Sequence, residues 1–315
     1  MSGASNAGED TIVDFGKLVQ KMKDEGEELI LARPGISVML FYDTPVGKLG
    51  ATIAAILKDY LAFIAPDSME KYYAQSAMYK KLTPKIINST FDELRALEED
   101  DEFFEFHFGP GYDPGLGYAV HFKGSALADD EDLPNETNLL TLEFPPTFLT
   151  AKPPDAFIDF VVRNADRHKF HSGIVGYAFQ HPVMVLRDEA LEAIGKVAMR
   201  YRGFDISNDD IRDDLKGHVH NVSWLNLLSS RMVKEVGGLD KLRRALPKGG
   251  SLIEMKHGVL VRLAPLPIVG DMNQGGTDLK PLKDFAKIVK PLRIQVDYLG
   301  PDDELFAEKW LSRLD

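Results

Sequence analysis

The last third of the chain contains the stretch that decides the fold. His218–Leu225 (HVHNVSWL) is followed by the glycine pair Gly237 and Gly238, then by Gly258–Pro265 (GVLVRLAP) and Val269–Asn273 (VGDMN). This order predicts a strand, a helix that ends at a glycine, a second strand and a tight turn built from Gly, Asp and Asn. These residues therefore set the expectation of helices packed on a sheet.

Apolar spacing predicts further elements on both sides of this stretch. Helices are expected at residues 11–27, 47–64, 153–165, 188–201, 227–236, 239–246, 281–289 and 302–311. Strands are expected at 35–42, 103–108, 117–123, 139–144, 172–179, 219–225, 258–264 and 293–299, and an acidic loop at 126–138. Helices and hairpins are interleaved rather than strictly alternating, which indicates an α+β fold with a mixed, largely antiparallel sheet flanked by helices.

Two parts of the chain share one plan. Residues 35–63 and 172–204 each read as an apolar strand, a loop that contains proline, and a long amphipathic helix that ends in aromatic residues. We therefore expect a disordered tail at 1–10 and a single domain at 11–315, in which 11–150 and 151–315 form two related halves or resemble each other by chance.

Composition excludes several classes of protein. At 315 residues, with 44% hydrophobic and 27% charged residues, the chain can build a substantial core. Its first ten residues lack the pattern of a signal peptide, and no apolar run is long enough to cross a membrane. The absence of cysteine excludes disulfides and thiolate metal sites. We expect a cytoplasmic protein, and the sequence leaves monomer and homodimer open.

The acidic balance points to a protein partner. The formal net charge of −12 argues against direct binding of nucleic acid, which requires a basic footprint. Acidic residues occur in runs, and each run is either a solvated face or a surface that steers a basic partner. The candidate partner-binding acids are Glu98, Glu99, Asp100, Asp101, Asp209, Asp210, Asp213 and Asp214.

The remaining motifs offer little chemistry. His218 and His220 would share one face of a strand, but a zinc site needs a third ligand that the spacing does not supply. His107 and His121 are expected as strand residues beside aromatics. Asp271 and Asn273 are expected to hold a turn through their own side chains, or else to line a partner or ligand site. We expect neither a metal nor a cofactor.

The same residues carry a resemblance to a known family. The chain resembles the type VI immunity family from about Asp14 to Asp297. The similarity rests on the strand and helix after Gly35, on Gly173–Tyr201, and on the following residues of the second half: Asn221, Trp224, Gly237, Gly238, Gly258, Gly270, Asp271, Asn273, Pro291 and Arg293. Members of this family have no agreed catalytic residues, so the resemblance implies binding rather than chemistry.

The resemblance also implies a function. It predicts an immunity protein, not an enzyme, that neutralises a cognate type VI secretion toxin by masking its active or substrate-binding surface. A toxin that acts in the cytoplasm is expected, with a basic nuclease as the leading candidate. Two alternatives remain open: a hydrolase that uses Asp271 with a histidine, and a chaperone or adaptor that loads an effector.

Overall fold

The computed structural model describes residues 14–24, 26–65, 68–74, 78–110, 117–127, 134–182, 186–296 and 304–315. The strands are β1 (Gln20–Asp24), β2 (Glu27–Tyr42), β3 (Lys71–Ala74), β4 (Met78–Lys81), β5 (Phe103–Gly109), β6 (Ala119–Ser125), β7 (Asn138–Phe144), β8 (Ser172–Gln180), β9 (Asp205–Ile206), β10 (Leu225–Ser229), β11 (Ser251–Glu254) and β12 (Gly258–Arg262). The α-helices are α1 (Gly50–Phe63), α2 (Pro84–Ala96), α3 (Phe148–Ala151), α4 (Pro154–Ala165), α5 (Arg187–Ala198), α6 (Ser230–Glu235), α7 (Leu239–Ala245), α8 (Lys280–Val289) and α9 (Glu304–Leu311).

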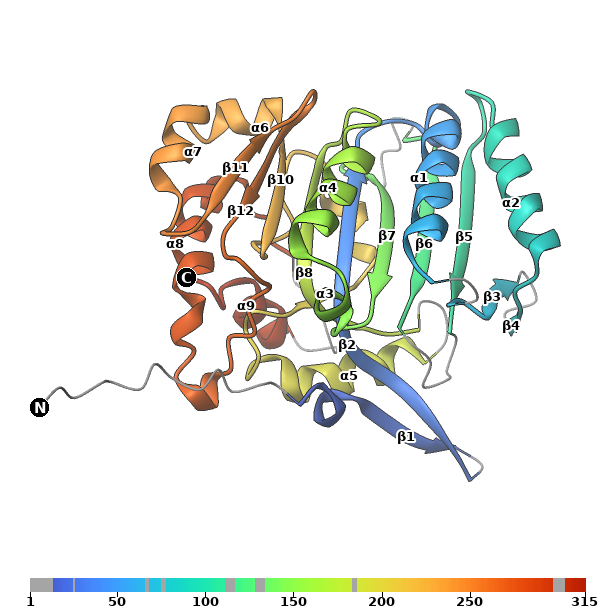
Figure 1. Cartoon of the computed structure of the whole chain (residues 1–315), viewed down its shortest axis with the longest axis horizontal. Coiled ribbons are helices and arrows are strands. Elements are labelled where there is room, and N and C mark those ends of the chain that lie inside the picture. The colour runs from blue at the N-terminus through green and yellow to red at the C-terminus, as the bar shows by residue number, and fades with distance from the viewer. Residues whose placement is uncertain are drawn as a thin grey trace, which may run out of the picture.

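These strands form one large sheet with helices packed against it (Figure 1). Its order is β11-β12-β10-β8-β2-β7-β6-β5-β3-β4, while β1 pairs with β2 and β9 pairs with β8. Within the described residues the β8–β9 pair is parallel and the other strand pairs are antiparallel. The predicted α+β fold with a mixed, largely antiparallel sheet is confirmed.

The helix expected over 11–27 is wrong in its described part. Phe15–Leu18 is a short 3-10 turn, and β1 then pairs with the beginning of β2, with Met22 opposite Leu29. Gly26 lies between the two strands with a φ of 91°. The long strand β2 supplies hydrogen-bond partners to β1, and this tertiary pairing overrides the helical spacing of the apolar residues. Residues 11–13 lie outside the described part.

The two strands that share a sequence plan lie side by side at the centre of the sheet. β2 and β8 are antiparallel, with Val38 opposite Val175, and each leads into a long helix, α1 or α5. Beyond β2 the sheet continues with β7, β6 and β5, whereas beyond β8 it continues with β10, β12 and β11. The order along the chain therefore differs between the two sides: β7, the strand next to β2, is the last of its three in the chain, whereas β10, the strand next to β8, is the first of its three. A relation between 11–150 and 151–315 as two halves remains a prediction.

One face of the sheet holds the main apolar core. Alternate residues of β2 pack there with α1 and α4, and with the apolar faces of β5, β6 and β7. Phe144 lies at its centre, with ring centroids 5.2 Å from Tyr60 and 5.1 Å from Phe157. Burial of this apolar surface favours folding, and it fixes the position of β5–β7 from one side. The opposite face of the same strands is free to carry polar residues.

The C-terminal third contains two shifted elements. The strand expected at 219–225 lies at Leu225–Ser229, and the helix expected at 227–236 is limited to Ser230–Glu235. All five residues of β10 are buried between β8 and β12, so no alternation of burial marks the strand in the sequence. The strand expected at 293–299 is wrong in its described part, where Arg293 makes a single bridge to Val219. Residues 297–299 lie outside the described part.

Other expectations in this region are confirmed. Gly237 follows α6 with a φ of 101°, and Gly237 and Gly238 donate backbone hydrogen bonds to Lys234 and Val233. This is the glycine-ended helix that the sequence predicts. Trp224 is buried in the core, and its indole N–H donates to the Ala264 carbonyl at 2.7 Å.

Several described elements were not predicted: the β3–β4 hairpin, α2, the short helix α3, the two-residue strand β9, and β11. The signal for α2 is present in the sequence, because Thr83 caps Ile86 and Pro84 is the first helical residue. The acidic loop at 126–138 is described only in part, and β7 begins at Asn138. Among the described helices, none has the length and apolar character needed to span a bilayer.

Candidate functional site

A layer of polar side chains covers the second face of β5, β6 and β7. Strand register places His107 opposite His121, His121 opposite Thr141, and Glu105 opposite Lys123, so these side chains share one face. His121 Nε2 lies 2.8 Å from Glu105 Oε1. His107 and His121 therefore lie on neighbouring strands, as expected from the sequence, and their ring centroids are 5.7 Å apart.

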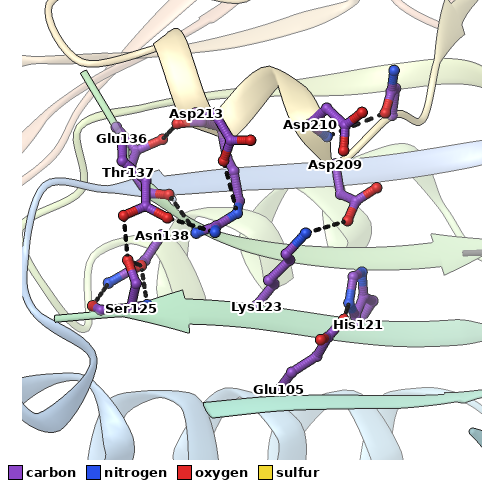
Figure 2. A network of polar contacts seen from close by, with 12 residues as sticks. Glu105, His121, Lys123, Ser125, Glu136, Thr137, Asn138, Asp209, Asp210 and Asp213 are labelled. Carbon is purple, nitrogen blue, oxygen red and sulfur yellow. Dashed lines mark hydrogen bonds and ion pairs between the residues drawn. The ribbon is translucent and has the colours of Figure 1, made fainter. Parts of the chain in front are cut away.

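The segment from Phe204 to Leu215 covers this polar layer and contains a 3-10 helix at Asp210–Asp214 (Figure 2). Lys123 of β6 points to Asp209, with Nζ 3.3 Å from Oδ2, and the side chain of Asp209 is 11% exposed. Burial acts to raise the pKa of Asp209, but the charges of His121 and Lys123 outweigh it, so the pKa lies below its ordinary value. Asp210 forms an ion pair with Arg187 at the start of α5.

Arg212 anchors the other end of the segment. Its guanidinium is 2.5 Å from Glu136 and 3.3 Å from Asp213, and it donates to the Thr137 carbonyl. The Glu136 carboxylate also accepts from the Ser125 hydroxyl at 2.6 Å. Arg212 and Glu136 are both buried. This arrangement fastens the segment to the beginning of β7 and the end of β6.

These contacts change the interpretation of the acidic run at 209–214. Asp209, Asp210 and Asp213 each have a cationic partner from within the chain, and Asp214 also has an interaction partner. Since three of these carboxylates are paired with lysine or arginine side chains, the run contributes less free negative charge than its sequence indicates. Its contacts within the chain are those of a structural clamp, and partner binding by this run stays a prediction.

A small polar cavity lies under the clamp. It has a volume of about 20 Å³, close to what one water molecule occupies. Its lining is formed by His107, Ala119, His121, Thr141, Glu143, His181, Ser207 and Asp209. Among the described residues, the buried Nδ1 of His107 and Nε2 of His181 find no hydrogen-bond partner. The cavity is too small for an organic substrate.

Burial controls the protonation of the groups around this cavity. It lowers the pKa of His107 to about 3, with a further contribution from His121. It also lowers the pKa of His181. Burial raises the pKa of Glu143 to about 7, against the opposing effect of Arg33 and of the hydrogen bond from Ser207. Near neutral pH His107 and His181 are therefore neutral, and the carboxyl group of Glu143 is close to its titration point.

The two histidines considered as metal ligands are separated. Neither lies on a regular strand; His218 is exposed, whereas His220 is buried beside Asp205, with Nε2 3.2 Å from Oδ2. Across the ranges that the structure describes, no group of three or more His, Asp or Glu side chains is arranged to hold a metal ion. The expectation that both histidines share a strand face is wrong because the strand begins later, at Leu225.

Asp271 and Asn273 occupy the predicted tight turn. The Asp271 carboxylate accepts the Asn273 backbone N–H at 2.9 Å and begins a 3-10 helix. The same carboxylate forms a two-point ion pair with Arg200 at 2.9 and 3.0 Å, which lowers the pKa of Asp271. Asn273 is exposed. The turn-holding interpretation of Asp271 is thus supported by contacts, with Arg200 as a partner that the sequence did not reveal.

The other acidic run lies on the surface. Glu98, Glu99 and Asp100 are exposed in the turn between α2 and β5. Asp101 holds this turn, because its carboxylate accepts the Glu98 backbone N–H at 2.6 Å. Glu99 forms an ion pair with Lys48 at 2.5 Å, and both side chains are well exposed. This turn therefore presents negative charge to solvent.

Sequence reasoning missed the cations that organise the site, namely Lys123, Arg187 and Arg212. A partial signal was available, because Glu105 and His107 on β5 and His121 and Lys123 on β6 alternate with aromatic residues. That alternation indicates a strand with one apolar and one polar face. The alternation gives no indication that Asp209, which lies 86 positions after Lys123 in the chain, covers the polar face.

Comparison with known proteins agrees with this fold. The structure is similar to that of the Pseudomonas aeruginosa T6SS protein PA0821, with a TM-score of 0.75 and 20% sequence identity over 93% of this chain and 85% of that chain. At this identity the likeness is one of fold. No curated protein matches the chain. The family model TsiV, described as type VI immunity for VRR-NUC, matches residues 52–314, and the chain therefore belongs to this type VI immunity family.

Proposed function

We propose that this protein binds and neutralises a cognate type VI effector with nuclease activity in the cytoplasm, by masking the active or substrate-binding surface of that effector. The observation that carries the proposal is the family match, which covers most of the chain and names immunity against VRR-NUC. The nuclease, its location and the masking mode go beyond that match.

Electrostatics supports a basic partner. A nuclease must present positive charge where it contacts the phosphate backbone. The chain has a net charge of −12, and its turn at Glu98–Asp100 keeps carboxylates exposed. Such a surface would attract a basic nuclease and compete with nucleic acid for the same region.

The hydrolase alternative gains no support from the contacts of Asp271. Its carboxylate accepts twice from Arg200 and once from the Asn273 backbone N–H, so three of its about four acceptor positions already serve the turn. A general base needs an available lone pair within reach of the proton that it removes. An adaptor that loads the effector remains an outcome of the experiment below.

The direct test is co-expression with the candidate effector in a susceptible bacterium, followed by purification and a DNA-cleavage assay. We expect rescue of growth, a stable complex, and inhibition of cleavage that is complete at one equivalent. An effector mutated in its nuclease site, which should still bind, provides the matched control. Complex formation without rescue would indicate loading, and rescue at far less than one equivalent without a complex would indicate an enzyme; either result would contradict the proposal.

A further inference from the structure

A second polar pocket lies at one end of the central strands, away from the clamp. β2, β8, β10 and β12 are antiparallel neighbours, so the end of β2, the beginning of β8, the end of β10 and the beginning of β12 lie together. The connecting segments enclose a cavity of about 150 Å³. It is lined by Asp43, Lys169, Phe170, His171, Ser229, Ser230, Arg231, Lys256 and His257.

The lining is cationic, although the chain as a whole is acidic. Lys169, Arg231 and Lys256 face a single carboxylate, that of Asp43. In the described part of the chain, the ammonium groups of Lys169 and Lys256 have no ion-pair partner. Arg231 pairs with Glu235 one helical turn away, at 3.4 Å, and both of these side chains are about half exposed. Such a pair is weak and leaves the guanidinium available.

Hydrogen bonds hold the wall of the pocket in place. The Asp166 carboxylate accepts the backbone N–H groups of Lys256 and His257 at 3.0 and 3.2 Å. The Ser230 N–H donates to the His257 carbonyl at 3.1 Å, which ties the beginning of α6 to the β11–β12 turn. His171 is fixed by the Gly217 N–H, which donates to its Nε2 at 2.9 Å. The cations therefore project from a preorganised frame.

Burial keeps His171, at the wall of the pocket, neutral near neutral pH. Burial lowers the pKa of His171 to about 4 against the opposing charge of Asp43, and Arg231, His218 and Lys216 lower it further. Burial and the charge of His257 also lower the pKa of His168. His171 therefore adds no positive charge to the lining, whose cations are Lys169, Arg231 and Lys256.

We propose that this pocket binds a phosphate group, held by Lys169, Lys256 and Arg231. Three cations from three separate segments match a tetrahedral dianion better than they match a planar carboxylate with one negative charge. The hydroxyls of Ser229 and Ser230 line the same cavity and provide neutral donors. This proposal is independent of the immunity function, because it needs no effector.

The test is titration of the purified protein with inorganic phosphate by calorimetry, with chloride at equal ionic strength as the reference and acetate as the carboxylate probe. We expect saturable binding of phosphate and none of acetate. Replacing both lysines (Lys169→Gln with Lys256→Gln) should weaken binding by about tenfold or more for each lost charged contact. Arg231→Gln provides a second, independent variant.

The matched control is Lys58→Gln with Lys85→Gln, which removes two exposed lysines from α1 and α2. It should bind phosphate like the wild type, and thermal melts in chloride should show that all variants are folded. A parallel titration with adenosine monophosphate separates a phosphomonoester, which would bind more tightly, from free phosphate. Three results would overturn the site: no saturable binding of either phosphate probe, equal loss in the control, or acetate binding as tight as phosphate binding.

Discussion

The two acidic runs of this chain, Glu98–Asp101 and Asp209–Asp214, look alike in the sequence and have different environments. In the first, Glu98, Glu99 and Asp100 are exposed in a turn, and the ion pair between Glu99 and Lys48 is well exposed. In the second, Asp209, Asp210 and Asp213 pair with Lys123, Arg187 and Arg212. The first run projects charge outward, whereas the second fastens a segment over the polar face of the sheet (Figure 2).

The difference follows from where the cations come from. Lys123 belongs to β6 and Arg187 to α5, so each pair joins elements that are distant in the chain. A carboxylate that leaves water needs such a partner, because burying an unpaired charge is costly. An acidic run can thus be a solvated surface or a structural clamp, and the cations around it decide which.

The strongest test of the clamp is Arg212→Ala. The substitution leaves Glu136 buried without its cation and removes the hydrogen bond to the Thr137 carbonyl. We expect the free energy of unfolding to fall by about 3–5 kcal/mol, as measured by chemical denaturation. Arg95→Ala, which removes an exposed pair with Asp92 on α2, should change it by no more than about 0.5 kcal/mol. Equal effects of the two substitutions would mean that the clamp carries no particular stability.

Much of the architecture was predictable because its signal is local. α1, α4, α5 and α8 bury one continuous apolar stripe each, and the spacing of that stripe is visible in the sequence. The N-terminal hairpin was missed because β1 depends on pairing with β2, which local spacing does not contain. β10 was shifted because burial on both faces removes the alternation that marks a strand. The periodicity of apolar residues therefore predicts most of the fold, except where the pairing of strands overrides it.

The site was less predictable, because it depends on contacts between distant residues. The acids at 209–214 were recognisable as a group, and Asp271 as a turn residue. Their partners Lys123, Arg187 and Arg200 were not recognisable, since no local rule joins them to those acids. The same applies to the phosphate pocket, whose cations come from the segments before β8, after β10 and before β12.

Glu143, which lies beneath Asp209, allows a test of the clamp by pH. Burial raises its pKa from an ordinary value of 4.5 to about 7. An acid whose pKa is higher in the folded state than in the unfolded state contributes its full stabilisation below the unfolded-state pKa. This contribution to the free energy of unfolding is lost as the pH rises from about 4.5 toward 7. Glu143→Gln should therefore gain about 1–3 kcal/mol relative to the wild type between pH 5 and pH 8, as measured by denaturation at each pH. A constant difference between the two proteins would show that the carboxyl group is solvated.

A smaller effect is expected at the third acidic feature, the turn at Asp271. Asp271→Ala removes the ion pair with Arg200 and the cap on the Asn273 N–H, and should lower the free energy of unfolding by about 0.5–2 kcal/mol. Asn273→Ala should lie at the low end of that range, because its side chain is exposed. Protection against the effector should persist wherever the fold persists. Unchanged stability with lost protection would place this turn in the interface instead.

The smallest effect on stability, and the clearest on association, is expected at the exposed run. Reversing Glu98, Glu99 and Asp100 to lysine should leave the free energy of unfolding almost unchanged. Asp101 is kept, because its carboxylate holds the turn. If the partner is basic, the association rate should fall by about tenfold at low salt, and its dependence on ionic strength should weaken. The dissociation rate should change little, since exposed charges act over a Debye length of about 8–10 Å and add little to the bound contact.

The matched control reverses Asp188, Glu189 and Glu192 on α5, which are also exposed; Glu192 forms an ion pair with Lys196, as Glu99 does with Lys48. Both variants gain the same charge, so a change in net charge alone would slow association equally in the two. A larger loss of rate at Glu98–Asp100 would locate the steering surface there, because the field of a charged patch is strongest near the patch itself. Equal losses would assign the steering to net charge, and a rate insensitive to salt and to both reversals would remove electrostatic attraction from the binding mechanism.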